Sequence, residues 1–183
     1  MPLLLGLATL LLCGAFQGGK LVKTRIGKAV TMLVPADFME MSTQDASRLA
    51  QSYRKSMAQY TSADRTVTLS VNRSFSRWGE GDIGMVKDFY KASLLQLFDD
   101  TDFVRETVET INGRQFAVFE FTSTIKDTGE EVIRRKSDVR KYNYIQYTIV
   151  DNNNMVFSFS APANGSGVWQ KQVRQIMQSV RVD

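Results

Sequence analysis

The sequence predicts a single α+β domain in which helices pack on both faces of a mainly antiparallel sheet, an αβα-type sandwich. Apolar and polar residues alternate along several stretches, as in strands with one buried face. Short turn signals join consecutive strands, which indicates antiparallel pairing. The remaining segments carry apolar residues at helical spacing. The chain has 183 residues, of which 43% are hydrophobic and 23% charged, enough for one domain with its own core.

The N-terminus is typical of a secretory signal. Residues 1–16 read MPLLLGLATLLLCGAF, without a charged side chain. This run is shorter than the roughly 20 residues that span a bilayer, and it matches the apolar region of a signal peptide although a positive n-region is missing. We expect a signal peptide over residues 1–16 and export to the periplasm or cell envelope. The alternative is a buried N-terminal helix, which the absence of a polar stripe disfavours.

Cys13, the only cysteine, allows a second interpretation of the same segment. The stretch Leu10-Leu11-Leu12-Cys13-Gly14 resembles a bacterial lipobox, which makes Cys13 a candidate lipidation site. Leu12 stands where a small residue is usual, so simple cleavage is favoured. Contact with a membrane is expected only if Cys13 carries a lipid.

The predicted elements follow in order. Residues 17–27, rich in Gly and basic residues, are expected to be a linker, and the domain is expected to cover residues 28–183. The patterns predict a strand over 28–34, a helix from Ser42 or Thr43 to Arg54, and a hairpin of 57–62 with 66–74. A helix with Asp82 as N-cap should run to Phe98 and bury one apolar stripe, formed by Met85, Val86, Phe89, Tyr90, Leu94, Leu97 and Phe98.

The C-terminal half reads as strands closed by a helix. Asn112-Gly113 predicts a type I′ turn between strands 103–110 and 114–125. A turn at 127–129 precedes a strand or strand pair over 131–150. After a turn at 151–153, Met155, Phe157 and Phe159 alternate in the next strand. The final helix is predicted over 168–178, with its inward residues at Val168, Val173, Ile176 and Met177.

In this order, four stretches resemble the fold shared by the photosystem II extrinsic protein PsbP and its Ran-binding nuclear-transport relative. They are TMLVPADFMEMS, ETVETINGRQFAVFEFTS, YNYIQYTIVDNNNMVFSFSAP and WQKQVRQIMQSVRV. The resemblance covers residues 28–183. It implies a sandwich around an antiparallel sheet and a protein that docks on larger assemblies rather than a catalyst. It supplies no catalytic residue.

Composition argues against most catalytic chemistry. The chain contains no histidine, which removes the commonest general base and metal ligand. It also contains no phosphate-binding loop and no dinucleotide fingerprint. We therefore expect no enzyme activity, no cofactor and no metal site. Asp99, Asp100 and Asp102 read as a solvated loop, because they lack the spacing of a hard-cation site.

Candidate partner-binding residues occur in two stretches. Trp78 lies in a Gly-rich segment, where an aromatic side chain either anchors a partner or covers the end of the core. The basic segment with interleaved tyrosines contributes Arg134, Arg135, Arg140, Tyr142 and Tyr144. Basic and aromatic residues together also suit single-stranded nucleic acid, but the charges are scattered and export is expected, so no nucleic-acid partner is predicted.

Three functions are compatible with these features. The first is a non-catalytic envelope protein that docks on a protein partner. The alternative is a carrier of a small molecule or lipid, which requires an apolar cavity between helices and sheet. A hydrolase using carboxylates alone would need two carboxyl groups facing each other. For Glu120, between Phe119 and Phe121, we weigh a general acid against a structural pair with an Arg or Lys of a neighbouring strand.

Overall fold

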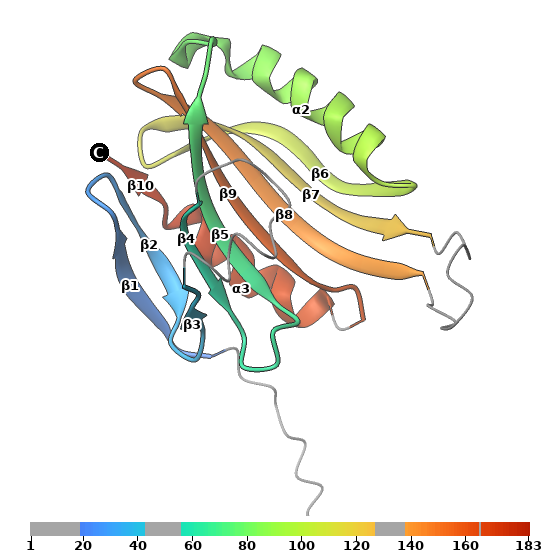
Figure 1. The fold of residues 1–183 in the computed structure, drawn as a ribbon. Coiled ribbons are helices and arrows are strands. Elements are labelled where there is room, and N and C mark those ends of the chain that lie inside the picture. Colours follow the sequence, from blue (N-terminus) through green and yellow to red (C-terminus); the bar gives the residue numbers. More distant parts are fainter. Residues whose placement is uncertain (1–18, 43–55, 127–137, 165) are drawn as a thin grey trace, which may run out of the picture.

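A seven-stranded sheet, antiparallel throughout, forms the centre of the protein (Figure 1). The computed structural model describes residues 19–42, 56–126, 138–164 and 166–183. The strand order is β3-β4-β5-β9-β8-β7-β6. The strands are β3 (Met39–Glu40), β4 (Ser56–Thr61), β5 (Thr68–Phe75), β6 (Asp100–Ile111), β7 (Arg114–Ile125), β8 (Val139–Val150) and β9 (Asn153–Pro162).

A second, three-stranded sheet corrects the predicted linker. Its strands are β1 (Leu21–Ile26), β2 (Val30–Pro35) and β10 (Arg181–Val182), in the order β1-β2-β10. The linker prediction for 17–27 was wrong over β1, because the segment LVKTRI shows no apolar–polar alternation and is flanked by glycines. Gly27 turns the chain into β2 with a φ of 60°, a conformation that glycine adopts without strain.

The predicted hairpins are confirmed. Asn112 and Gly113 join β6 to β7 with φ values of 49° and 85°, the positive values at both central residues that a type I′ turn needs. Asp151 and Asn152 join β8 to β9 with φ values of 48° and 56°. Polar residues that tolerate the left-handed region therefore set the register of the central strands.

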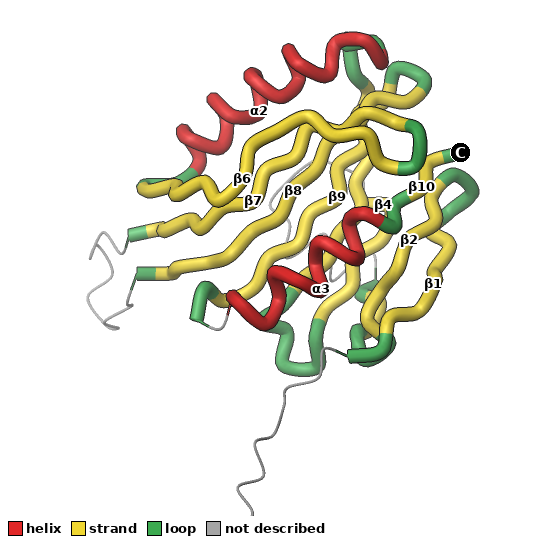
Figure 2. Tube along the Cα trace, turned by 180° about the vertical axis from the view of Figure 1, so that it is seen from behind, coloured by secondary structure: helices red, strands yellow, loops and turns green. Residues whose placement is uncertain are grey.

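Two long helices cover opposite faces of the large sheet, which confirms the αβα-type sandwich and the α+β fold class. Helix α2 (Ile83–Leu97) packs over β6, β7 and β8. Helix α3 (Ser166–Gln178) packs on the other face, against β8, β9 and β2. Figure 2 shows α3 in front of the sheet when the molecule is seen from behind.

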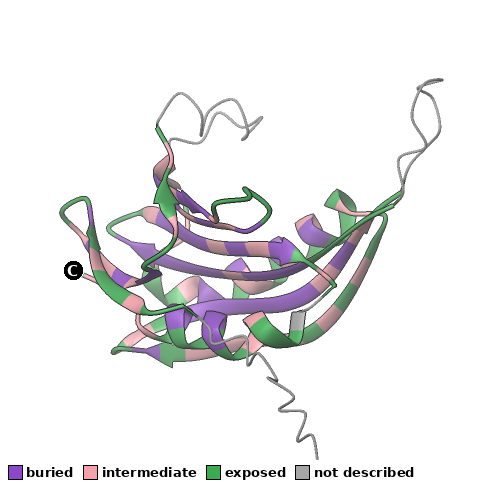
Figure 3. Ribbon diagram, turned by 90° about the horizontal axis from the view of Figure 1, so that it is seen from below, coloured by how far each residue is buried: buried purple, intermediate pink, exposed green. Residues whose placement is uncertain are grey.

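Each face has its own core (Figure 3). The core under α3 is the larger one and includes the inner face of the small sheet. Side chains alternate along each central strand, so neighbours such as Phe116 and Ala117 enter different cores. The core under α2 consists of Ile83, Val86, Tyr90, Leu94, Ala117, Phe119, Phe121, Tyr147, Ile149 and Val156.

Several predicted features lie outside the described residues. They are the signal segment 1–16 with Cys13, the helix from Ser42 or Thr43 to Arg54, the turn at 127–129, and the beginning of the strand predicted from residue 131. No helix in the described ranges is both long and apolar enough to cross a membrane.

Candidate functional site

The residues predicted to contact a partner do not form one surface. Tyr142 and Tyr144 are fully buried in the core under α3, so their prediction as contact residues was wrong. Strand alternation turns both rings toward α3 rather than toward solvent. Arg140 is exposed on β8. Arg134 and Arg135 lie outside the described residues.

The two predicted stretches also lie at opposite ends of the sheet. Trp78 precedes α2, near the turn between β8 and β9. Arg140 lies near the start of β8, at the far end of the same strand, opposite Thr124 of β7. Figure 1 shows these two ends separated by the length of the strands. A surface built on Trp78 therefore has to recruit other neighbours.

Helix α2 supplies those neighbours, because its apolar stripe is wider than the face it buries. Ile83, Val86, Tyr90 and Leu94 point into the core. Met85 is 58% exposed and Phe89 is 52% exposed, although both were predicted to lie in the buried stripe. These two residues are one helical turn apart and share a face. We name Trp78, Met85 and Phe89 the Trp78 surface.

Aromatic contacts hold this surface in place from below. The Trp78 ring packs edge-on against Phe89, with 4.9 Å between ring centroids, and against Tyr90 at 6.2 Å. Tyr90 stacks on Tyr147 of β8 at 3.9 Å, and Asn154 of β9 donates a hydrogen bond to the Tyr90 hydroxyl. The exposed Phe89 thus rests on rings that continue into the core, which limits its freedom before any partner binds.

The segment that carries Trp78 is fixed at both ends. The Ser76 backbone N–H donates to the Asn152 carbonyl at 2.8 Å, and the Trp78 N–H donates to the Ser76 hydroxyl at 3.1 Å. Asp82 is the N-cap of α2, as predicted, but its carboxylate accepts from the Gly79 N–H at 2.8 Å instead of from α2. The segment is therefore a tied turn and presents Trp78 in one position.

Charged residues anchor the other side of α2 to the edge strand β6. Glu106 accepts from Lys87 at 2.9 Å and pairs with Lys91 at 2.6 Å. The hydrogen bonds from Lys91 and then Lys87 lower the pKa of Glu106, and the bond to Glu106 raises the pKa of Lys87. These pairs lie on the β6 side of α2, whereas Trp78 contacts the opposite side through Phe89.

Glu120 belongs to a different arrangement, under α3. Its carboxylate is fully buried and accepts a hydrogen bond from the Tyr142 hydroxyl at 2.9 Å. Arg174 of α3 donates from Nε and from Nη2, at 2.9–3.1 Å, and engages both carboxylate oxygens. Glu120 is therefore paired with an arginine, as predicted for a structural role. The arginine comes from a helix and not, as predicted, from a neighbouring strand.

This network offers no acid for hydrolysis. Both oxygens of Glu120 are engaged by Arg174, and one also by Tyr142. Burial, then the Glu120 charge, raises the pKa of Tyr142 far above its ordinary value. A carboxylate occupied on both oxygens and closed off from solvent does not face a substrate. The arrangement fits a role in locking α3 onto the sheet.

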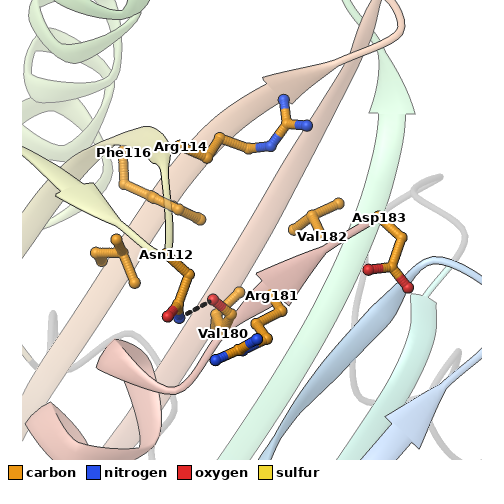
Figure 4. A pocket seen from close by; sticks show the side chains of 8 residues that line it. Asn112, Arg114, Phe116, Val180, Arg181, Val182 and Asp183 are labelled. Carbon is orange, nitrogen blue, oxygen red and sulfur yellow. Dashed lines mark hydrogen bonds between the residues drawn. The ribbon is translucent and has the colours of Figure 1, made fainter.

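The β6–β7 turn, the β8–β9 turn and the C-terminal segment lie at one end of the large sheet (Figure 1). Two hollows are lined by residues of or next to these turns or of the C-terminal segment, and a third by residues at the end of β5. Figure 4 shows the one lined by Ile111, Asn112, Arg114, Phe116 and residues 180–183, with a volume of about 380 Å³. The Asn112 amide donates to the Val180 carbonyl at 2.8 Å and so joins the turn to the C-terminal segment.

The other two hollows flank this one. One, of about 380 Å³, shares Arg114 and reaches Glu80, which accepts a hydrogen bond from the Arg114 guanidinium at 2.9 Å. The third, of about 460 Å³, lies at the end of β5 beside Phe75. None of the three is lined by α2 or α3, so they do not supply the cavity between helix and sheet that a carrier requires.

Comparison with known proteins bears on the fold. A scan against protein-family models finds no match, and a search of curated protein sequences finds none either. Solved structures do match. The cyanobacterial PsbP of Synechocystis sp. PCC 6803 superposes with a TM-score of 0.59 at 14% identity, over 93% of this chain and 97% of that chain. This protein has the PsbP-like fold.

Two further structures agree with this assignment. The Ran-binding protein Mog1p of Saccharomyces cerevisiae matches with a TM-score of 0.58 at 11% identity, over 90% of this chain and 96% of that one. LpqN of Mycobacterium tuberculosis, described as involved in cell envelope biogenesis, matches with a TM-score of 0.55 at 12% identity, over 89% and 90%. Identities this low establish the shared fold and leave function to the residues.

Sequence reasoning identified Trp78 but missed Met85 and Phe89 as surface residues. The signal was present in the width of the apolar stripe. A helix that packs on one sheet buries a single stripe of positions three to four residues apart. Val86, Tyr90 and Leu94 already form that stripe, so Met85 and Phe89 make the apolar face wider than one sheet buries. Phe75 is 77% exposed, and nothing in the sequence indicated this. Its exposure follows from its position as the last residue of β5, and the pattern does not fix where β5 ends.

Proposed function

We propose that this protein is an exported, non-catalytic protein that docks on a protein partner in the cell envelope through the Trp78 surface. One observation carries the proposal: an exposed Phe89 and Met85 lie beside Trp78 and rest on rigid aromatic packing. Large aromatic side chains held in one position supply most of the binding energy at protein interfaces, because little conformational freedom is lost on binding.

The non-catalytic part of the proposal is supported by the chemistry of the residues. Histidine is absent from the chain. Within the described ranges, Glu106 is bound to two lysines and Glu120 to an arginine, on opposite faces of the sheet. No group of three metal-ligating side chains occurs in these ranges. A scaffold with these properties is better suited to binding than to bond cleavage.

Export and envelope location are supported by the leucine-rich residues 1–16. Two proteins with the same fold offer an analogy: LpqN is described as involved in cell envelope biogenesis, and Mog1p as Ran-binding. The analogy motivates a search for a protein partner in envelope fractions, and fold alone does not identify that partner.

The test is site-specific photocrosslinking in the organism of origin. A photoreactive amino acid at position 85 samples the Trp78 surface. We expect one crosslinked adduct of defined mass in the envelope fraction, which weakens at least severalfold when Phe89→Ala is added, because the main aromatic contact is then lost.

Position 95 provides the matched control. Leu95 lies on the same helix, is 51% exposed, and points away from the Trp78 surface. The photoreactive residue at position 95 should give no adduct of that mass, and Leu95→Ala should leave the adduct from position 85 unchanged. Equal adducts from both positions, or an adduct from position 85 that Phe89→Ala does not weaken, would exclude docking through this surface.

A further inference from the structure

The hollow at the end of β5 carries a second inference, separate from the Trp78 surface. Phe75 is the last residue of β5 and is 77% exposed. It lies on the opposite side of the tied Ser76 segment from Trp78, whose ring joins the core under α2. Arg73 precedes it by two residues and lines the same hollow of about 460 Å³. This volume lies within the roughly 300–1,000 Å³ of ligand sites.

The hollow has an apolar floor and an open strand edge. Met57, at a bulge in β4, packs toward Gly27, where its Cε atom lies 3.5 Å from the position of an added Cβ. The described pairing of β4 with β5 ends at Asn72, while β5 continues to Phe75, paired there with Asn153 of β9. On its β4 side, this end of β5 has no partner strand within the described ranges.

One charged side chain, Arg73, is among the described residues that line the hollow. Gly27 also lines it, and the exposed Arg25 and Lys28 lie close to Gly27 in the chain. The Arg25 guanidinium donates to the Lys28 carbonyl at 2.8 Å and folds over the turn. In the part of the chain that the structure describes, these three side chains form no salt bridge, and no carboxylate lines the hollow.

We propose that this hollow binds an acidic segment of a partner protein, in which carboxylates flank one bulky apolar side chain. The apolar side chain would lie on Phe75 and Met57, and the carboxylates would pair with Arg73 and Lys28. Arginine binds carboxylates with two parallel hydrogen bonds, and its planar group also packs on aromatic rings. Arg73 beside the exposed Phe75 ring, with Lys28 next to Gly27, therefore complements this kind of segment.

A lipid surface fits the same site less well. Binding to anionic membranes usually depends on four to eight basic residues close together on one surface, whereas one basic residue, Arg73, lines this hollow, with Arg25 and Lys28 close to its Gly27 in the chain. The apolar contact is also recessed beside Met57, which suits a side chain that projects from a peptide. The inference goes beyond the proposed docking function and stands without it, because it involves neither Trp78 nor Phe89.

The test is selection of peptides from a random displayed library on the purified full-length protein. We expect selected peptides to be enriched in Asp and Glu next to one aromatic or large aliphatic residue. Their affinity, measured by fluorescence anisotropy, should fall about tenfold or more in Phe75→Ala and in Arg73→Glu, since each removes one half of the recognition. Both side chains are exposed, so both variants should keep the wild-type melting temperature.

Phe89→Ala is the matched control and should bind the selected peptides as the wild type does. Loss of binding in Phe89→Ala as well would assign the peptides to the Trp78 surface and overturn this inference. Selection of peptides without acidic residues, or of none, would overturn it too. Vesicles with anionic lipid should not bind through Arg73 and Phe75, and if they do so while peptides do not, the occupant is a membrane.

Discussion

The two helices of this protein use their apolar residues differently. Helix α3 buries Val173, Ile176 and Met177 completely and adds the Glu120–Arg174 pair beneath it. Helix α2 buries a similar stripe but leaves Met85 and Phe89 in solvent beside Trp78. Val168, near the start of α3, was predicted to face inward and is 43% exposed, so that prediction was wrong. The difference is that α2 exposes two large apolar side chains next to a tryptophan ring.

This difference distinguishes apolar residues that stabilise the fold from apolar residues that are free to contact a partner. Exposing a large apolar side chain gives up the roughly 1.5–3 kcal/mol that its full burial contributes, so an exposed cluster that is also rigidly supported calls for an explanation. On α3 the explanation of these buried groups is internal, because each contacts another part of the chain. On α2 the internal contacts account for one side of the helix only, and the exposed side is the surface for which we propose a partner.

The largest expected effect tests the orientation of α2 with two adjacent leucines. Leu94 is buried in the core under α2, and Leu95 is half exposed. Leu94→Ala should lower the free energy of unfolding by about 2–5 kcal/mol, because it leaves a cavity, whereas Leu95→Ala should change it by less than about 0.5 kcal/mol. Urea unfolding followed by circular dichroism measures both. Similar losses in the two variants would mean that α2 is rotated about its axis.

The next effect tests the pair under α3. Arg174→Leu leaves the Glu120 carboxylate buried without its partner. Breaking a buried pair costs about 3–5 kcal/mol, and we expect about 2–3 kcal/mol because the Arg174 side chain is 46% exposed and water screens the charge. Glu120→Leu combined with Arg174→Leu should cost less than the single change, since no unpaired charge remains. A double variant that is less stable than the single one would contradict a purely structural role.

A smaller effect concerns alkaline pH and the same face. Burial, and then the Glu109 charge, raises the pKa of Tyr144 to about 12. The unfolded chain therefore releases this proton first as the pH rises above about 10, and Tyr144 by itself should lower the free energy of unfolding by about 1.4 kcal/mol per pH unit up to about pH 12. Tyr142, whose pKa is also raised, adds to this fall. This contribution is complete below pH 10.

Tyr144→Phe is the control for that titration. Among the described residues, the Tyr144 hydroxyl makes no hydrogen bond, so its removal should change stability at pH 7 by less than about 0.5 kcal/mol. The variant should lose stability less steeply than the wild type between pH 10 and 12. An unchanged slope would mean that Tyr144 does not titrate with a raised pKa.

The sequence was sufficient for the fold because its signals are local. Alternation along residues 142–150 and the Asn112-Gly113 turn depend on neighbours in the chain, and both features are confirmed. The strand β1 was missed because its three apolar residues, Leu21, Val22 and Ile26, do not alternate with the polar ones. The two-residue β10 was missed because such a short pairing leaves no periodic pattern.

The candidate site was harder to predict from the sequence, because it depends on which side of each strand or helix faces the core and which side faces solvent. Tyr142 and Tyr144 look like surface aromatics beside Arg140 and Lys141, yet α3 covers them. Phe89 looks like core within an apolar helix, yet α2 overhangs the sheet there. Tertiary packing decides such cases. For Trp78 a binding role and a covering role were both considered; its ring packs against the core under α2, and the binding role stays a prediction.

The most direct test of the whole account is a paired measurement on Phe89→Ala. The account predicts that the purified variant loses no more than about 1.5 kcal/mol of its free energy of unfolding, the size of an aromatic pair contact, while its crosslinked adduct from position 85 in the envelope fraction falls severalfold. A stability loss above about 2 kcal/mol, with the adduct unaffected, would show that Phe89 belongs to the core and that α2 presents no docking surface.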